Sequence, residues 1–142
     1  MKRILAATDG SEGGERAVEL AAQLAHALDG TILILTVMND FPESSLNALM
    51  RSESDIGEVV ELLVNQILNQ ARTCAARAGA TRIETLSGWG DATQSIINFA
   101  REHHADAIVV GRRGRGQLSG LLLGSVSQKL VTLAPCPVIV VP

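Results

Sequence analysis

The stretch that decides the fold is VVGRRGRGQLSGLLLGSVSQKL, residues 109–130. It begins inside the short apolar run 107–110, passes through a segment rich in glycine and arginine, and enters a helical pattern at Gly124. A continuous apolar run is typical of a strand buried on both faces of a sheet. The stretch therefore predicts a buried strand, a glycine-rich connection and a helix that ends before Pro135.

Strand patterns recur on both sides of this stretch. Three further continuous apolar runs predict buried strands at 3–8, 31–37 and 138–141. Residues 82–86 alternate between apolar and polar and predict an edge strand with one solvated face.

Helical patterns lie between the strands. Apolar residues at helical spacing predict helices at 11–28, 55–78, 91–103 and 124–133. Gly30 and Gly79 are expected to end the first two helices. Asp91 and Gln94 have the spacing of a capping box at the start of the third.

Strict alternation of strands and helices predicts one α/β domain over residues 1–142, with a five-stranded parallel sheet and helices on both faces. Right-handed crossovers are expected between the strands. The long polar connection 39–54 is interpreted as an ordinary surface loop rather than a mobile lid.

Composition narrows the classes of function. With two Phe, one Trp and no Tyr among 142 residues, the core must be aliphatic, and few aromatic side chains exist to stack on nucleic-acid bases. The net charge of −3 also argues against a nucleic-acid partner. No run is long enough for a membrane span, and the apolar run 4–7 is too short for a signal peptide, so we expect no membrane association and a cytoplasmic location.

The two cysteines are not expected to carry chemistry. Cys74 and Cys136 do not form a Cys-x-x-Cys pair and have no histidine cluster beside them. They are interpreted as small buried hydrophobic residues in a reducing compartment, rather than as a disulfide or a zinc site.

A ligand is expected where the first and fourth strands end, because open α/β sheets bind ligands at the carboxyl ends of strands where the strand order reverses. The first strand is followed by TDGS, residues 8–11, and the fourth by GRRGRG, residues 111–116. Glycines let a phosphate approach the backbone closely, and the helix that opens at Gly124-Ser125 offers free N–H groups. Two anion-binding elements in one connection indicate a polyphosphate ligand.

The spacing of this segment is specific. It lacks the lysine of a Walker A loop and the spacing of GxGxxG. Gly111, Gly114, Gly124 and Ser125 instead fit G-x2-G-x9-G-S/T, which resembles the ATP-binding signature of the universal stress protein family. ILAATDGSEGGERAVELAAQLA, residues 4–25, and residues 99–141 also resemble that family, whereas residues 39–80 resemble it less.

The resemblance implies the strand order 3-2-1-4-5, in a fold like that of the adenine-nucleotide alpha hydrolases. It also implies roles for individual residues. Asp9 would contact the adenosine part of ATP, Ala7 and Thr8 would line the same wall, and the backbone of Val37 would meet adenine. The ribose and phosphates would be surrounded by Gly111, Arg112, Gly114, Gly124, Ser125 and Val126.

The function implied is that of an ATP-binding regulatory protein of the stress response. ATP would carry Mg²⁺ or Mn²⁺ across its phosphates, and occupancy would be read by a protein partner that the sequence does not name. No nucleophile–base pair at a telling spacing is present, so a dedicated enzyme is not predicted. The alternatives are a slow ATPase or nucleotide transferase, with autophosphorylation included, and an interaction protein whose loop stays empty.

Structural interpretations compete with these roles. Asp9 can simply cap the first helix, Ser125 can serve only as a helix-start residue, and Arg112, Arg113 and Arg115 can form an exposed charged loop. Where relatives often have Gly-Asp-Pro, this chain has WGDA at 89–92. Trp89 is expected to fill a surface groove near the edge strand rather than to pack on the base.

The last apolar run predicts an oligomer. Residues 138–141 would form an edge strand flanked by Pro137 and Pro142, and proteins usually cover or pair an exposed hydrophobic edge. We therefore expect a symmetric homodimer in which Val138–Val141 meets its mate, as the resemblance also implies.

Overall fold

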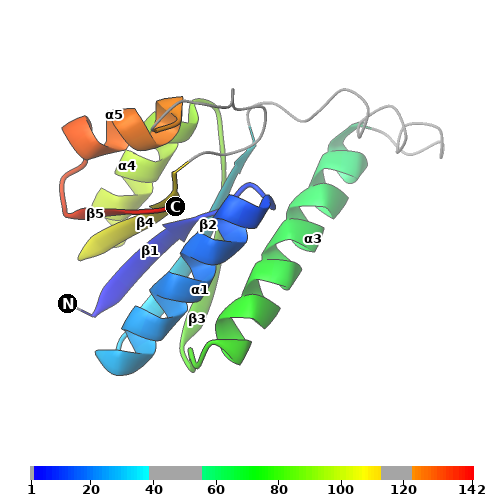
Figure 1. The fold of residues 1–142 in the computed structure, drawn as a ribbon. Helices are drawn as coiled ribbons and strands as arrows, with labels where there is room; N and C mark the ends of the chain where they lie inside the picture. Colours follow the sequence, from blue (N-terminus) through cyan, green and yellow to red (C-terminus); the bar gives the residue numbers. More distant parts are fainter. Residues whose placement is uncertain (1, 39–55, 113–122) are drawn as a thin grey trace.

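The computed structural model describes residues 2–38, 56–112 and 123–142. Strands and helices alternate within them (Figure 1). The elements are β1 Arg3–Ala7, α1 Glu12–Ala27, β2 Thr31–Met38, α3 Ile56–Arg77, β3 Ile83–Trp89, α4 Ala92–Glu102, β4 Ala107–Gly111, α5 Ser125–Leu133 and β5 Val138–Val141. All strand pairs are parallel, and the order is β3-β2-β1-β4-β5. The predicted fold class and strand order are confirmed.

The sheet is buried on both faces, as the continuous apolar runs predict. On one face, Ile4, Ile32 and Val109 pack against apolar residues of α1 and α3. On the other face, Leu5 and Ile108 pack against α4 and α5. Figure 1 shows the two helix pairs on opposite sides of the sheet. The core is aliphatic and divides into two layers because neighbouring strand residues point to opposite faces.

The outer strands of the sheet agree with the prediction, but the ends of β3 and β2 do not. β3 and β5 are the outer strands, and the residues of β3 are only partly buried or exposed. The expected third strand ended at Leu86, whereas β3 continues to Trp89 because Ser87, Gly88 and Trp89 pair with the last residues of β2. β2 likewise extends one residue beyond the expected end, to Met38.

The predicted helix ends have different stereochemistry. α3 ends at Arg77, and Gly79, two residues later, has φ of +109° and fits the left-handed position of a helix stop. At the end of α1 the left-handed residue is Asp29, with φ of 55°. Gly30 is needed there for space instead, because a Cβ on it would lie 2.3 Å from the carbonyl oxygen of Lys2.

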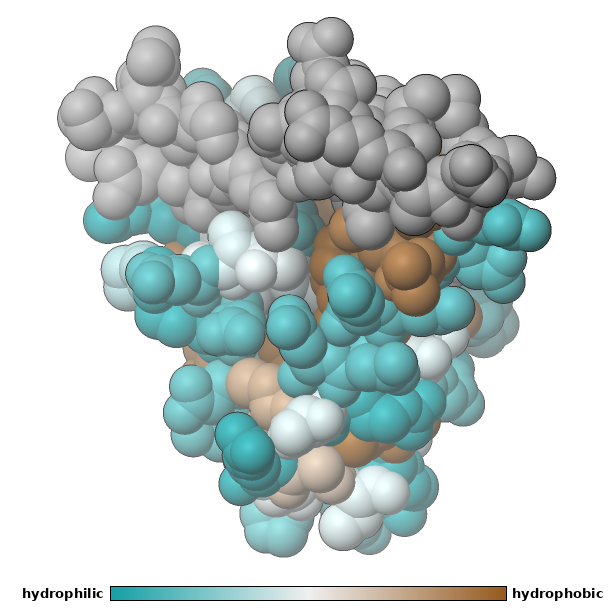
Figure 2. All heavy atoms as spheres, turned by 90° about the vertical axis from the view of Figure 1, so that its right-hand side faces the viewer, coloured by the Kyte–Doolittle hydropathy of each residue, from teal (hydrophilic) through white to brown (hydrophobic). Residues whose placement is uncertain are grey.

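The outer surface on the α3 side is uneven in polarity. The side of the molecule on which α3 lies is mainly hydrophilic, with hydrophobic side chains gathered in its upper half (Figure 2).

Cys74 and Cys136 pack at the margins of the two core layers but are only partly buried, so the expectation that they are buried is wrong. No helix within 2–38, 56–112 and 123–142 combines the length and the apolar character needed to cross a membrane.

Asp106 holds the beginning of β1 against the beginning of β4. Its carboxylate accepts hydrogen bonds from the N–H groups of Lys2 at 2.7 Å and Arg3 at 2.9 Å. These two bonds lower the pKa of Asp106 from its usual 3.8. A lowered folded-state pKa contributes stability above the unfolded pKa and loses it as the pH falls through the folded pKa.

We expect Asp106→Ala to lower the free energy of unfolding at pH 7, and we expect that deficit to shrink as the pH falls below about 4. Urea denaturation at a series of pH values measures both effects. Glu102→Ala, at an exposed carboxylate close by in the chain, is the control and should show a smaller deficit at pH 7. A deficit for Asp106→Ala that is the same at pH 7 and pH 3 contradicts the assignment.

Candidate functional site

The carboxyl ends of β1 and β4 lie side by side at the point where the strand order reverses. Ile4, Leu5 and Ala6 of β1 pair with Ala107, Ile108 and Val109 of β4. The chain leaves β1 for α1 on one face of the sheet and leaves β4 for α5 on the other (Figure 1). In α/β proteins, ligands commonly bind at such a switch point, in a crevice between the diverging connections.

The turn after β1 is braced by its own side chains. Asp9 Oδ1 accepts a hydrogen bond from the N–H of Ser11 at 2.9 Å, and Thr8 Oγ1 accepts one from Gly10, whose φ is +82°. The side chain of Ser11 accepts from the N–H of Gly14 and is the N-cap of α1. The alternative in which Asp9 caps the helix is therefore wrong, because Ser11 holds that position.

The first turn of α1 lies very close to both strands. A Cβ on Gly14 would be 2.4 Å from Thr8 Oγ1, and a Cβ on Gly111 would be 2.9 Å from the carbonyl group of Gly13. Gly111 was expected to be glycine so that a phosphate could approach. The structure gives a packing reason for it, because the backbone of α1 occupies that space.

The turn after β4 is tied at its base. The carbonyl oxygen of Arg112 accepts the N–H of Gly124 at 2.7 Å and the hydroxyl of Ser127 at 2.9 Å. The N–H of Arg112 donates to the carbonyl of Val141 in β5 at 2.7 Å. The backbone of one residue, Arg112, therefore connects the end of β4, the start of α5 and the end of β5.

The amino end of α5 has the character of an anion site. Its N-cap, Gly124, supplies no side-chain hydrogen bond, and its first turn contains no acidic residue. By contrast, α1 has Ser11 as a cap and Glu12 and Glu15 in its first turn. The positive end of the α5 dipole is thus not offset by its own side chains.

The side chain of Arg112, beside this helix end, carries a hydrogen-bond donor without an acceptor among the described residues. Its Nε is buried and has no hydrogen-bond partner in the described part of the chain. A buried donor without an acceptor carries a free-energy cost of about 1–3 kcal/mol, which an anionic ligand would remove.

Val37 presents its backbone to the crevice. In β2, Thr31 bonds toward β1 and Ile32 bonds toward β3, so odd-numbered residues of the strand direct N–H and C=O to the β1 side. The last such bond runs from Thr8 N–H to the carbonyl of Leu35. Val37 is the next residue with the same orientation, two residues beyond Leu35, which pairs with the last residue of β1.

The described part of the predicted site is brought together at one edge of the sheet. It consists of Ala7, Thr8, Asp9, Val37, Gly111, Arg112, Gly124, Ser125 and Val126. Ser125 is exposed, whereas the side chain of Val126 is partly buried against the core. Gly114, Arg113 and Arg115 lie outside the described residues, as does the whole connection 39–54.

Trp89 lies at the end of the outer strand β3. Its side chain is 72% exposed, so the expectation that it fills a surface groove is wrong. It pairs with Met38 at the end of the outer strand β3, two strands away from β1.

Two features of the site were not predicted from the sequence. Ser127 is 3% exposed and bonds to Arg112 across the connection, and Gly13 packs on Gly111. Ser127 precedes the buried Leu130 by three residues, so helical spacing places both on the same face of α5. This spacing could have predicted from the sequence that Ser127 is buried.

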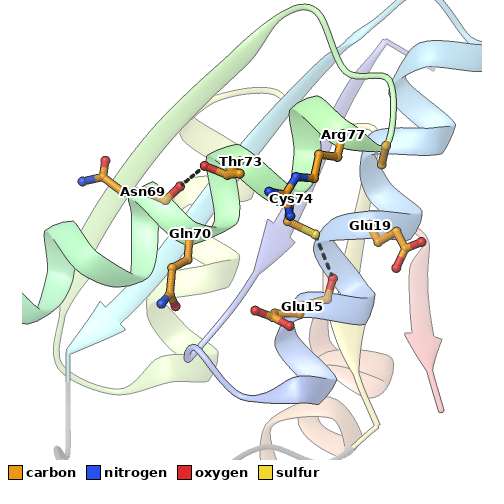
Figure 3. A pocket seen from close by; sticks show the side chains of 8 residues that line it. Glu15, Glu19, Asn69, Gln70, Thr73, Cys74 and Arg77 are labelled. Atoms are coloured by element: carbon orange, nitrogen blue, oxygen red, sulfur yellow. Dashed lines mark hydrogen bonds between the residues drawn. The ribbon is translucent and has the colours of Figure 1, made fainter.

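A second hollow lies between α1 and α3 (Figure 3). Its volume is about 600 Å³, and it is lined by Glu15, Glu19, Asn69, Gln70, Thr73, Cys74, Arg77 and Ala78. Cys74 Sγ lies 3.7 Å from the carbonyl oxygen of Glu15. Burial raises the pKa of the Cys74 thiol, and the carboxylates of Glu15 and Glu19 raise it further, which disfavours the reactive thiolate.

The strand order, the two helical layers and the crevice at the β1–β4 switch define a doubly wound parallel α/β protein. The family model described as the universal stress protein family matches residues 1–142, and the chain belongs to that family.

Individual relatives agree with this assignment. The chain is 34% identical over 145 residues to universal stress protein YxiE of Bacillus subtilis, with 98% of this chain and 97% of the relative covered. A crystal structure of a universal stress protein in complex with cAMP has a TM-score of 0.78 and 29% identity, covering 99% of this chain and 97% of that one. The Archaeoglobus fulgidus protein in complex with dAMP, at 21% identity and a TM-score of 0.71 over 100% and 98% of the two chains, supports the fold alone.

We expect Ser11→Ala to lower the free energy of unfolding by about 1 kcal/mol, because it removes the N-cap of α1. Ser125→Ala should cost less than half as much, since the N-cap of α5 is Gly124 and Ser125 is exposed. Urea denaturation without nucleotide compares the two. Equal losses would restore the interpretation of Ser125 as a capping residue.

Proposed function

We propose that this chain binds ATP in the crevice between the ends of β1 and β4 and acts as a nucleotide-dependent regulatory protein. The observation that carries the proposal is the amino end of α5, which has no side-chain cap, next to Arg112, whose buried Nε has no hydrogen-bond partner among the described residues. The relative in complex with cAMP supports an adenine nucleotide as the ligand class. The G-x2-G-x9-G-S/T spacing supports ATP within that class.

The adenosine part would lie on the β1–β2 side of the crevice. Asp9 would accept hydrogen bonds from the ribose hydroxyls, since a carboxylate is a strong acceptor for such donors. Ala7 and Thr8 would form the adjoining wall. The backbone of Val37, which is directed toward the β1 side beyond Thr8, would meet the edge of adenine.

The phosphates would lie on the β4–α5 side. In α5 the first intrahelical bond runs from Gln128 N–H to the carbonyl of Gly124, so the N–H groups of Ser125 and Val126 have no acceptor within the helix. Arg112 would supply a cation beside them, and Gly111 and Gly124 would line the approach. Gly114 is assigned the same role by its spacing. Mg²⁺ or Mn²⁺ would bridge phosphate oxygens.

Regulation is favoured over turnover because no nucleophile held by a base is found among the site residues that the structure describes. A nucleotide then acts through its occupancy, which a protein partner must distinguish from the empty state. Release of phosphate from ATP, measured alongside binding, separates this function from that of an ATPase. Turnover near 1 per second or faster would favour the enzyme.

Calorimetric titration with ATP and magnesium, and with adenosine, tests the site. We expect Arg112→Gln to weaken ATP binding about ten- to a hundredfold, the effect of losing one charged hydrogen bond, and to leave adenosine binding unchanged. Arg101→Gln, at an exposed arginine in the last turn of α4, is the matched control and should bind both like the wild type. No saturable binding of ATP by the wild-type chain would refute the proposal.

The same proposal includes a homodimer through β5. All four residues of β5 are half-buried, and the strand lies at the edge of the sheet. Pro137 and Val141 direct their carbonyls to β4, so Val138 and Val140 direct their N–H and C=O groups outward. These outward groups are what a second copy of the strand would pair with.

Val140→Pro tests the dimer because it removes an outward N–H and leaves the bonds to β4 in place. We expect the wild-type chain to sediment as a dimer at micromolar concentration and Val140→Pro to sediment as a monomer. Val140→Thr keeps the N–H and a similar shape, so it should remain dimeric. A wild-type monomer, or a Val140→Pro dimer, would exclude pairing through β5.

A further inference from the structure

Ser127 is a buried polar residue at the base of the proposed phosphate site. Its side chain is 3% exposed, and its Oγ lies 2.9 Å from the carbonyl oxygen of Arg112 and 3.1 Å from that of Gly124. Its single hydroxyl hydrogen therefore lies between two carbonyl acceptors. Both acceptors belong to the segment that leads from β4 into α5.

The bond to Arg112 joins residues that flank the connection between β4 and α5. Fifteen positions separate Ser127 from Arg112, and the N–H of Gly124 donates to the same carbonyl oxygen at 2.7 Å. Two donors from the first turn of α5 thus converge on one acceptor at the end of β4. The start of the helix is held against the strand by this pair of bonds.

The attachment of Gly124 and Ser127 to the carbonyl of Arg112 determines the direction of the N–H groups at the start of α5. Ser125, Val126 and Ser127 precede the first intrahelical bond, so their N–H groups lack acceptors within α5. Gly124 provides no side-chain cap that would fix the turn by other means. The hydroxyl of Ser127 is turned inward, so it acts on a ligand through the backbone that it holds.

We infer that Ser127 is a positioning residue for the phosphate groups of the bound nucleotide. Its hydroxyl fixes the first turn of α5 on the carbonyl of Arg112, so that the N–H groups of Ser125 and Val126 and the side chain of Arg112 act on one anion. The inference rests on the proposed function. It predicts a loss of affinity confined to the phosphates, because Asp9 lies in the turn after β1 and Val37 lies on β2.

Thr132 offers a matched control on the same helix. Its Oγ1 donates to the carbonyl of Gln128 at 3.3 Å, a bond of the same chemical type, but Thr132 is exposed and the bond stays within α5. Removing this hydroxyl changes the helix without releasing it from β4.

The experiment titrates wild type, Ser127→Ala and Thr132→Ala with ATP and with adenosine, and records thermal unfolding without ligand. We expect Ser127→Ala to weaken ATP binding at least tenfold while adenosine binding stays within twofold of wild type. Thr132→Ala should stay within twofold for both ligands. Ser127→Cys, which keeps the shape and supplies only a weak donor, should also lose ATP affinity selectively and serves if the alanine variant does not fold.

The outcomes distinguish failure of the positioning role of Ser127 from failure of the proposed ATP binding. Equal losses for ATP and adenosine in a folded Ser127 variant would reduce Ser127 to a structural residue and overturn the inference. Unchanged ATP binding in Ser127→Ala would overturn it as well, while leaving the proposed function intact. Absence of ATP binding by the wild-type chain would overturn both.

Discussion

The crevice depends on how closely the first turn of α1 approaches the ends of β1 and β4. A Cβ on Gly14 would lie 2.4 Å from Thr8 Oγ1, and a Cβ on Gly111 would lie 2.9 Å from the backbone of Gly13. Real side chains do not tolerate such distances, so any larger residue would force the helix outward. Gly14 and Gly111 therefore set the position of the Asp9 turn relative to β4, and with it the shape of one wall of the proposed crevice.

The opposite wall depends on the backbone of one residue, Arg112. Arg112 donates its N–H to Val141 of the edge strand and accepts, on its carbonyl, hydrogen bonds from Gly124 and Ser127. The proposed phosphate site and the proposed dimer strand are thus bonded to the same residue. Because the side chain of Arg112 also carries a buried donor without a partner in the described residues, backbone and side chain both place this residue at the centre of the site.

The fold was predictable because burial on both faces leaves a simple pattern, continuous apolar runs, and strict alternation leaves few topologies. The end of β3 was not, because Ser87–Trp89 join the sheet only through pairing with β2, and pairing leaves no local mark. The edge that holds the site was also predictable from the positions of Asp9 and Gly124. Which side chain caps α1 was not, since Asp9 and Ser11 are both good caps and the turn at Gly10 decides between them.

The contrast between helix ends supports the proposal that this acidic chain binds an anion beside Arg112. α1 begins with Ser11 as a cap followed by Glu12 and Glu15, which repel a phosphate, and α4 begins with the carboxylate of Asp91 bonded to the N–H of Gln94. α5 begins with neither a side-chain cap nor an acid. The net charge of −3 is thus distributed so that the helix start beside Arg112 is left to attract negative charge. Composition reports only the sum of the charges, whereas the hydrogen bonds of each first turn determine where an anion is accepted.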